Sequence, residues 1–177
     1  MKILACDFSS ERRSVALFAD GTLVGSAFEL GARTAHGSTL IQSVLRSGGV
    51  PVADVEAMVI GLGPGSYAGI RSAIALGQGW QLARGIHLGG VSSTELIASK
   101  AWTSGTRSVL GVVVDAKLRE YYLEEFDLSD ESCRDTQHLR MAGRADYQHR
   151  IAGGSMFVDR SLTRVPAWRG PVASSVG

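Results

Sequence analysis

The chain has 177 residues, of which 45% are hydrophobic and 20% charged, and its formal net charge is +1. This composition is typical of a globular protein with one ordinary domain or two small ones. The near-neutral charge excludes binding to nucleic acid or membrane that is driven by the field of the whole chain. The two cysteines form no Cys-x-x-Cys pair and are too few for a disulfide framework. No apolar run approaches a membrane span, so a cytoplasmic protein is the default expectation.

The first hundred residues predict three strands before any helix. Residues 2–6 are apolar and read as a buried strand. Residues 14–19 and 22–28 read as a hairpin, because Asp20-Gly21 is a strong two-residue turn signal between apolar runs. A helix is predicted over 38–47, with one apolar face at helical spacing. That face consists of Leu40, Ile41, Val44 and Leu45.

The central stretch predicts a strand, a glycine-rich turn and a helix. The apolar run 57–62 suits a buried strand, and Gly63, Pro64 and Gly65 then break it. Ser66 is placed to cap a helix that runs to about Arg84 and ends at Gly85.

Small residues recur along this second helix at spacings of three and four, so they form one stripe. The stripe comprises Ala68, Ser72, Ala75, Gly79 and Ala83, and Gly69, Ala73 and Gly77 widen it. Glycine inside a helix costs about 1 kcal/mol relative to alanine, so the missing side chains are expected to have a use. The use is close packing, either against the chain's own sheet or against a partner helix. Both readings stay open, since they can hold for different sides of the helix.

The turn can be compared with three sequence motifs of known chemistry. A phosphate-binding P-loop needs a Lys after its last glycine, and none follows Gly65. A nucleophile elbow needs Gly-x-Ser-x-Gly, but Pro64 and Ala68 flank Ser66 at the glycine positions. The segment from Gly63 to Ala68 fits the loose dinucleotide-binding pattern, which leaves that reading as an alternative.

The remainder of the chain predicts a second, shortened unit. A strand over 86–91 and a helix from about Ser92 complete a first domain, 1–104, and Gly105 begins a second, 105–177. Strands over 109–114 and 119–126 are expected to pair across the turn 115–118. Residues 129–150 are polar without a sustained apolar period, and one further strand over 151–158 would bend at Gly153-Gly154. The tail 165–171 reads as a loop.

Several segments carry a resemblance to a known family. Gly63-Pro-Gly-Ser-Tyr-Ala-Gly-Ile-Arg71 resembles the Gly-Pro-Gly-Ser-Phe-Thr-Gly-Val/Leu-Arg signature of the TsaB (YeaZ) family. Residues 3–10, 90–93 and 113–122 resemble that family's opening, Gly-Val-Ser and Asp-Ala-Arg segments, in the same order. The motif turn is carried by Gly63, Pro64, Gly65, Ser66, Gly69 and Arg71. The last fifty residues match poorly.

The resemblance implies an α/β fold of the sugar-kinase/Hsp70/actin-like superfamily, with a ribonuclease-H-like half followed by a shortened second half. It implies a non-catalytic scaffold that pairs with a TsaD-like paralogue and a TsaE-like ATPase to make N6-threonylcarbamoyladenosine (t6A) in tRNA. The chain is expected to reach tRNA only through that complex, and to form a homodimer when alone. The pairing helices correspond to about 38–47 and 67–84. We therefore expect the apolar face of the first and the small stripe of the second to form the interface and to remain exposed in the isolated chain.

The superfamily also implies candidate nucleotide contacts. They are Asp7, Ser9 and Ser10 in the turn after the first strand and Asp115 at the corresponding place in the second unit. At most weak ATP or ADP binding, and no turnover, is expected. The four histidines never occur at ligand spacing, and the segment where TsaD holds its metal has only His36, so no metal is expected. The alternatives are a small ATP-dependent kinase or hydrolase of the superfamily, and a dinucleotide-binding domain.

Overall fold

The computed structural model of the chain describes residues 1–30, 37–117, 120–143 and 156–159. The chain divides into two compact units, Met1–Lys100 and Ala101–Gly177, which are described separately. The division falls within helix α3 (Ser93–Thr103), a few residues before the boundary that Gly105 suggests.

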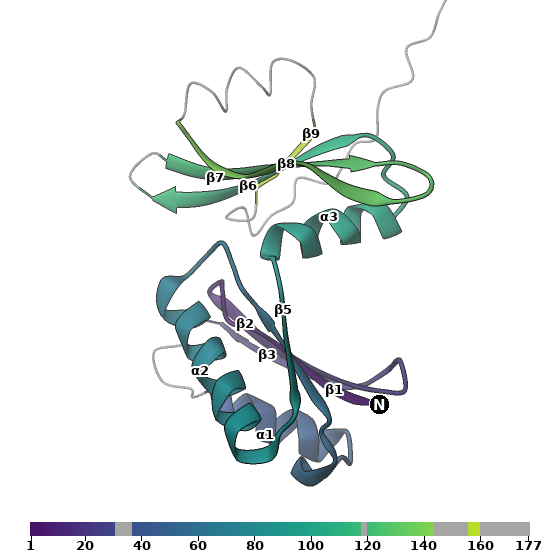
Figure 1. The fold of residues 1–177 in the computed structure, drawn as a ribbon, viewed down its shortest axis with the longest axis vertical. Helices are drawn as coiled ribbons and strands as arrows, with labels where there is room; N and C mark the ends of the chain where they lie inside the picture. The colour runs from purple at the N-terminus through teal and green to yellow at the C-terminus, as the bar shows by residue number, and fades with distance from the viewer. Residues whose placement is uncertain (31–36, 118–119, 144–155, 160–177) are drawn as a thin grey trace, which may run out of the picture. The chain divides into compact units, whose positions relative to one another are not determined.

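The first unit is built on a five-stranded sheet in the order β3-β2-β1-β4-β5 (Figure 1). Its strands are β1 (Lys2–Asp7), β2 (Arg12–Ala19), β3 (Thr22–Leu30), β4 (Ala57–Gly61) and β5 (His87–Val91). Strands β1, β2 and β3 are antiparallel neighbours, whereas β4 and β5 run parallel to β1. Three strands precede the first helix and alternating helices and strands follow, so the predicted α/β class with a ribonuclease-H-like half is confirmed.

The predicted hairpin forms at the predicted turn. Strands β2 and β3 pair with Ala19 opposite Thr22, which leaves Asp20 and Gly21 as the two turn residues. Both have positive φ, 50° and 80°, as a tight turn that matches the twist of two strands requires.

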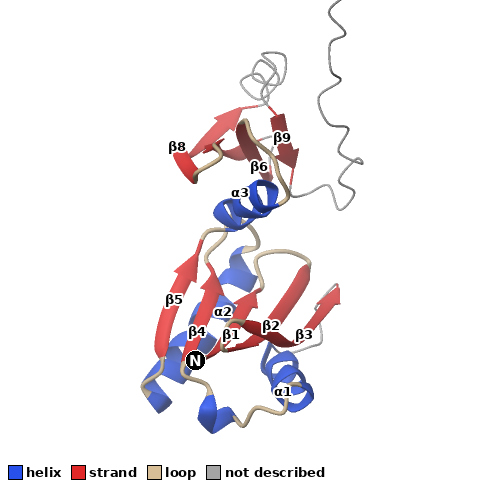
Figure 2. Cartoon of the chain, turned by 90° about the vertical axis from the view of Figure 1, so that its right-hand side faces the viewer, coloured by secondary structure: helices blue, strands red, loops and turns tan. Residues whose placement is uncertain are grey.

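Helices α1 (Gly37–Ser47) and α2 (Tyr67–Arg84) pack on one face of this sheet, and a short 3-10 helix, η1 (Val52–Asp54), lies between them in the chain (Figure 2). Helix α1 contacts β2 and β3, and α2 contacts β1, β4 and β5. One apolar core joins the sheet to both helices, with Leu4, Leu17 and Met58 at 0% exposure. The sequence places both helices correctly.

The ends of α2 form as its sequence predicts. The Ser66 hydroxyl accepts a hydrogen bond from the Gly69 amide at 3.3 Å, which satisfies one of the free donors of the first turn. Gly85 has a left-handed φ of 68°, and its amide donates to the Gln81 carbonyl at 2.7 Å.

The second unit contains a four-stranded sheet in the order β8-β7-β6-β9. Its strands are β6 (Val109–Lys117), β7 (Glu120–Leu128), β8 (Cys133–Gly143) and β9 (Met156–Asp159). The predicted pairing of the first two strands is confirmed, but the turn is shorter than predicted. Asp115 stands inside β6 opposite Tyr121, rather than in the turn, because a β-bulge carries the pairing on to Lys117.

Strand β8 lies within residues 129–150, the polar stretch in which the sequence predicts no helix or strand. It pairs with β7 along most of its length, although the register shifts twice. Most of its described side chains are exposed, so an apolar alternation never develops and the period-2 signal is absent. Gly153-Gly154 and the tail 165–171 lie outside the described residues. Among the described helices, none has the length and apolar character needed to cross a membrane.

Candidate functional site

Three chain segments of the first unit meet at the carboxyl ends of its parallel strands. They are the turn after β1, the glycine-rich turn after β4, and the start of α3 after β5. Because β1, β4 and β5 run in the same direction, their carboxyl ends share one edge of the sheet, where open α/β sheets usually bind ligands. This edge therefore holds the candidate nucleotide contacts Asp7, Ser9 and Ser10 together with the glycine-rich turn of the family motif.

The glycines of the motif allow the turn after β4 to press against the turn after β1. A Cβ added to Gly65 would lie 2.1 Å from the Ser9 carbonyl oxygen, and one added to Gly69 would lie 1.8 Å from the Phe8 carbonyl oxygen. These are main-chain atoms that cannot move aside cheaply. The Ser66 amide also donates to the Ser9 carbonyl at 2.7 Å. The motif thus has a packing role in this structure.

A buried polar cluster ties the turn after β1 to the start of α3. One Asp7 carboxylate oxygen, Oδ1, accepts from the Ser9 amide at 2.9 Å and also from the Ser9 hydroxyl. The Ser9 hydroxyl lies 3.1 Å from the Ser93 hydroxyl, and both side chains are 2% exposed. Buried hydroxyls need such partners, since an unmade hydrogen bond is costly there.

The start of α3 is fixed by a capping box. The Ser92 hydroxyl accepts a hydrogen bond from the Thr94 amide at 3.2 Å, and the Ser92 amide donates a hydrogen bond to a Glu95 carboxylate oxygen at 3.0 Å. The Ser93 amide donates to the Gly63 carbonyl at 2.7 Å, which joins this cap to the glycine-rich turn. Ser93 lies in the segment 90–93 that contributes to the family resemblance, but it was not among the predicted site residues.

The candidate nucleotide contacts Ser9 and Ser10 have hydrogen-bond partners within the protein in this structure. A phosphate needs amide or hydroxyl donors aimed at it, but the Ser9 amide and hydroxyl both donate to the Asp7 carboxylate, which repels an anion. The Ser10 hydroxyl donates to the Arg12 carbonyl at 2.9 Å instead. Asp115 belongs to the second unit, where it is exposed on β6. In the glycine-rich turn, a Cβ added to Gly63 would lie 2.5 Å from the Ile70 side chain, so this glycine too is used for packing.

Metal-ligating and nucleophilic groups can also be located in the part of the chain that the structure describes. No group of three or more His, Cys, Asp or Glu side chains could hold a metal ion there. Burial raises the pKa of the Cys6 thiol to about 12, so it stays protonated and is no nucleophile near neutral pH. Arg71 of the motif lies away from the polar cluster, with its guanidinium 5.3 Å from the centre of the Tyr67 ring.

Helix α2 has two chemically different sides, and each uses small residues. Gly69, Ala73 and Gly77 are buried, and a Cβ on Gly77 would lie 2.7 Å from the Leu88 side chain of β5. The predicted stripe faces outward: Ala68, Ala75, Gly79 and Ala83 are exposed and Ser72 is half-buried. A Cβ added to Gly79 would meet no atom within 4 Å. Packing against the chain's own sheet is therefore confirmed for the inner side of the helix, and packing against a partner helix stays a prediction for the outer side.

The apolar face of α1 corrects the sequence-based expectation. Leu40, Ile41, Val44 and Leu45 are only 8%, 2%, 0% and 3% exposed, because they pack into the unit's own core against the sheet. They do not form the open surface that the interface prediction gave them. Helix α1 is amphipathic enough to be buried by its own sheet, and the outward-facing surface comes mainly from α2.

A hollow of about 280 Å³ lies between α1, η1 and the last turns of α2. Its walls are mostly apolar, with polar groups at the edge, and Gly79 and Ala83 of the stripe belong to it. The lining residues are Ser38, Ile41, Gln42, Leu45, Val52, Gly79, Trp80, Ala83 and Arg84. We call this hollow the α1–α2 groove.

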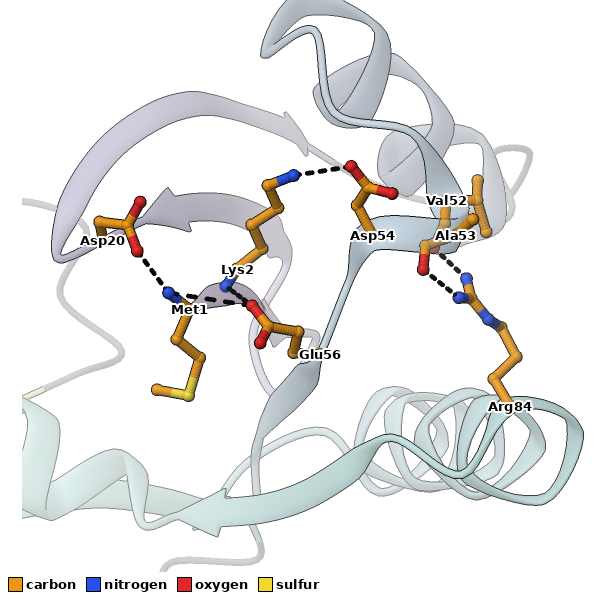
Figure 3. A network of polar contacts seen from close by, with 8 residues as sticks. All are labelled: Met1, Lys2, Asp20, Val52, Ala53, Asp54, Glu56 and Arg84. Carbon is orange, nitrogen blue, oxygen red and sulfur yellow. Dashed lines mark hydrogen bonds and ion pairs between the residues drawn. The ribbon is translucent and has the colours of Figure 1, made fainter.

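One wall of the groove is held by a network of polar contacts (Figure 3). The Arg84 guanidinium donates to the Val52 carbonyl and, at 2.6 Å, to the Ala53 carbonyl, which fastens η1 to the end of α2. On the other side of η1, the Lys2 ammonium donates to Asp54 at 2.7 Å, and the Lys2 amide donates to Glu56 at 2.6 Å. These contacts fix the segment that borders the groove.

The chain is similar in sequence to proteins of tRNA threonylcarbamoyladenosine biosynthesis. A family model described as "TsaD: tRNA N6-adenosine threonylcarbamoyltransferase" matches residues 32–144. The tRNA threonylcarbamoyladenosine biosynthesis protein TsaB of Escherichia coli K12 is 36% identical over 128 residues, which are 71% of this chain and 55% of that protein. The TsaB protein of Haemophilus influenzae is 28% identical over 127 residues, 71% of this chain and 53% of its own length.

Among solved structures, YeaZ from Pseudomonas aeruginosa is similar with a TM-score of 0.71 at 27% sequence identity. The similarity covers 80% of this chain and 66% of the YeaZ chain. The chain spans about half the length of the curated relatives it matches.

Proposed function

This chain belongs to the tRNA N6-adenosine threonylcarbamoyltransferase family, within it to the TsaB (YeaZ) group, and on that premise we propose that it is a non-catalytic subunit in t6A biosynthesis. It pairs with a TsaD-like paralogue that carries the catalytic site, and a TsaE-like ATPase acts on the pair. It meets tRNA only through this complex, in the cytoplasm.

The observation that carries this proposal is the exposed stripe on α2. Four small residues are exposed to solvent along one side of this long helix: Ala68, Ala75, Gly79 and Ala83. Among the described residues, no atom lies within 4 Å of a Cβ added to Gly79, so packing within the first unit does not account for this glycine. A flat outer helix face suits the close approach of a second helix, in which small residues bring two backbones together.

The chemistry of the loop cluster supports a scaffold rather than an enzyme. Asp7 and Ser9 form hydrogen bonds with each other, and the Ser9 hydroxyl also contacts the Ser93 hydroxyl at the start of α3. A scaffold needs such a junction to hold α2 and α3 at fixed positions, whereas a kinase would aim these groups at a phosphate.

The decisive experiment is co-purification of this chain with the TsaD-like paralogue of the same organism, followed by reconstitution of t6A formation on tRNA. We expect a stable complex, and t6A formation that requires both proteins together with the TsaE-like ATPase. Formation of t6A at an undiminished rate when this chain is left out would contradict the proposal. The chain alone is expected to hydrolyse no ATP.

A further inference from the structure

The helical layer of the first unit has an unusual distribution of charge. The sequence contains no acidic residue from Leu30 to Ala53 and none from Ala57 to Thr94, and Asp54 and Glu56 between these segments are the exceptions. Asp54 ends η1 and pairs with the Lys2 ammonium, and Glu56 accepts a hydrogen bond from the Lys2 amide (Figure 3). Helices α1 and α2 themselves carry arginines and no carboxylates.

Two of these arginines flank the outward-facing surface. Arg71 lies on α2 two turns before Gly79, and Arg46 lies on α1 one turn after Gln42, which lines the α1–α2 groove. Both are exposed, and none of the ion pairs among the described residues involves either one. The third arginine, Arg84, is held at the groove wall by two carbonyls.

The surface between these charges is apolar. Leu82 is 87% exposed on the last turns of α2, and the same turns line the α1–α2 groove together with Ile41 of α1. An exposed leucine on the turns that line an apolar hollow suits a protein helix that brings aliphatic side chains, rather than RNA, which would need a denser array of cations and stacking aromatic rings.

We propose that this surface selects an acidic partner helix over a second copy of the chain. The helix places an aliphatic side chain in the α1–α2 groove, and its flanking carboxylates face Arg71 and Arg46. This inference rests on the proposed pairing with a TsaD-like paralogue and specifies the chemistry of the paralogue's contacting helix. A two-fold self-pairing through the same surface places arginines of both copies at one interface and brings no carboxylate from either helix, so the homodimer is the weaker competitor.

The complex with the paralogue and the homodimer are expected to change in opposite directions as salt rises, so the salt dependence of association distinguishes them. Salt screens attraction between unlike charges, so the complex with the paralogue weakens as salt rises. Salt equally screens repulsion between like charges, so self-association of the chain strengthens. We would measure both by sedimentation velocity of the full chain, alone and mixed with the purified paralogue, at low and high sodium chloride.

Variants at Arg71 supply the second arm of the test. Arg71→Glu is expected to weaken binding of the paralogue by about tenfold at low salt, an effect typical of reversing one interface charge, and Arg71→Lys should restore most of it. Arg134→Glu is the matched control, because it makes the same change of net charge at an exposed position of the second unit. It should leave the affinity unchanged.

Each remaining result would overturn a specific part of the proposal. A complex with the paralogue that is insensitive to salt and to Arg71→Glu overturns the charge inference while leaving the proposed function intact. Self-association that is tighter than the complex at low salt overturns the choice of partner. Binding of purified tRNA by the chain alone that is lost in Arg71→Glu, with the paralogue bound normally, assigns the surface to RNA. Absence of any complex refutes the proposed function, and self-association that weakens with salt then refutes the charge inference separately.

Discussion

The carbonyl oxygen of Ser9 accepts a hydrogen bond from the amide of Ser66 at 2.7 Å, across 57 positions of sequence. This bond joins the turn after the first strand to the cap residue of the central helix. It requires the two backbones to meet directly, which is possible because Gly65 and Gly69 carry no side chain there. The motif that carries the family resemblance is therefore the point at which α2 is fastened to the sheet.

Two glycines of α2 are predicted to respond to alanine with opposite signs. Gly69→Ala places a Cβ 1.8 Å from the Phe8 carbonyl oxygen, and the strain should lower the free energy of unfolding by about 2 kcal/mol or more. Gly79→Ala meets no atom and gains helix propensity, so it should raise stability by up to about 1 kcal/mol. Urea denaturation of the two variants measures both effects. Equal changes in both variants would contradict the close contact at Gly69.

Asp7 is predicted to act on stability and not on nucleotide binding. Asp7→Ala removes the acceptor of two hydrogen bonds from Ser9 and leaves buried donors without it, which should cost about 1–3 kcal/mol of unfolding free energy. ATP with magnesium should leave the melting temperature of the wild-type chain unchanged, because a ligand that does not bind the folded state cannot stabilise it. A melting temperature that rises with ATP in the wild type, but not in Asp7→Ala, would instead assign Asp7 to a nucleotide site.

Cys6 is predicted to make the chain less stable at alkaline pH. Burial raises the pKa of its thiol from 9.0 to about 12, so above pH 9 the unfolded chain loses a proton that the folded chain keeps. The free energy of unfolding should then fall with rising pH by up to about 1.4 kcal/mol per pH unit between these two pKa values. Stability of the wild type and of Cys6→Ala at pH 8 and 10 isolates the effect, since other groups titrate equally in both. Parallel pH profiles would show that Cys6 is not the cause.

Bulk on the outer stripe is predicted to block association without unfolding the chain. Ala75→Trp and Gly79→Leu add side chains to exposed positions, so the circular dichroism spectrum should stay close to wild type and the melting temperature should not fall. Pull-down by the TsaD-like paralogue and self-association should both be lost, because closely packed helices leave no room for the added atoms. Gln81→Leu is the control, as this exposed residue lies outside the stripe on the same helix. Wild-type affinity in both stripe variants would remove the stripe from the interface.

The sequence was informative wherever local rules decide the structure. Ser66 and Gly85 mark the ends of α2, Asp20 and Gly21 mark the hairpin, and each position has the backbone or cap that its residue type favours. The fold class follows from the order of these elements. For the small residues of α2, spacing alone could not distinguish packing against the sheet from packing against a partner, and the structure confirms the sheet contact for Gly69, Ala73 and Gly77.

The failures arose where tertiary context decides. The apolar face at Val44 and Leu45 was assigned to a partner, because a sequence gives no measure of how much surface one sheet can cover. Strand β8 has mostly exposed side chains, so its pairing with β7 leaves no pattern to read. Ser93 joined the polar cluster through contacts with Ser9, a residue 84 positions away, which no window of sequence can reveal.

The separation of inner and outer small residues on α2 has a consequence for how such a subunit changes over time. Gly69, Ala73 and Gly77 carry the folding constraint, while Ala75, Gly79 and Leu82 contact solvent in the isolated unit. Substitutions on the outer side can therefore accumulate, or be engineered, with little loss of stability. Partner preference in this chain is thus open to redesign by a few surface changes, with the core left as it stands.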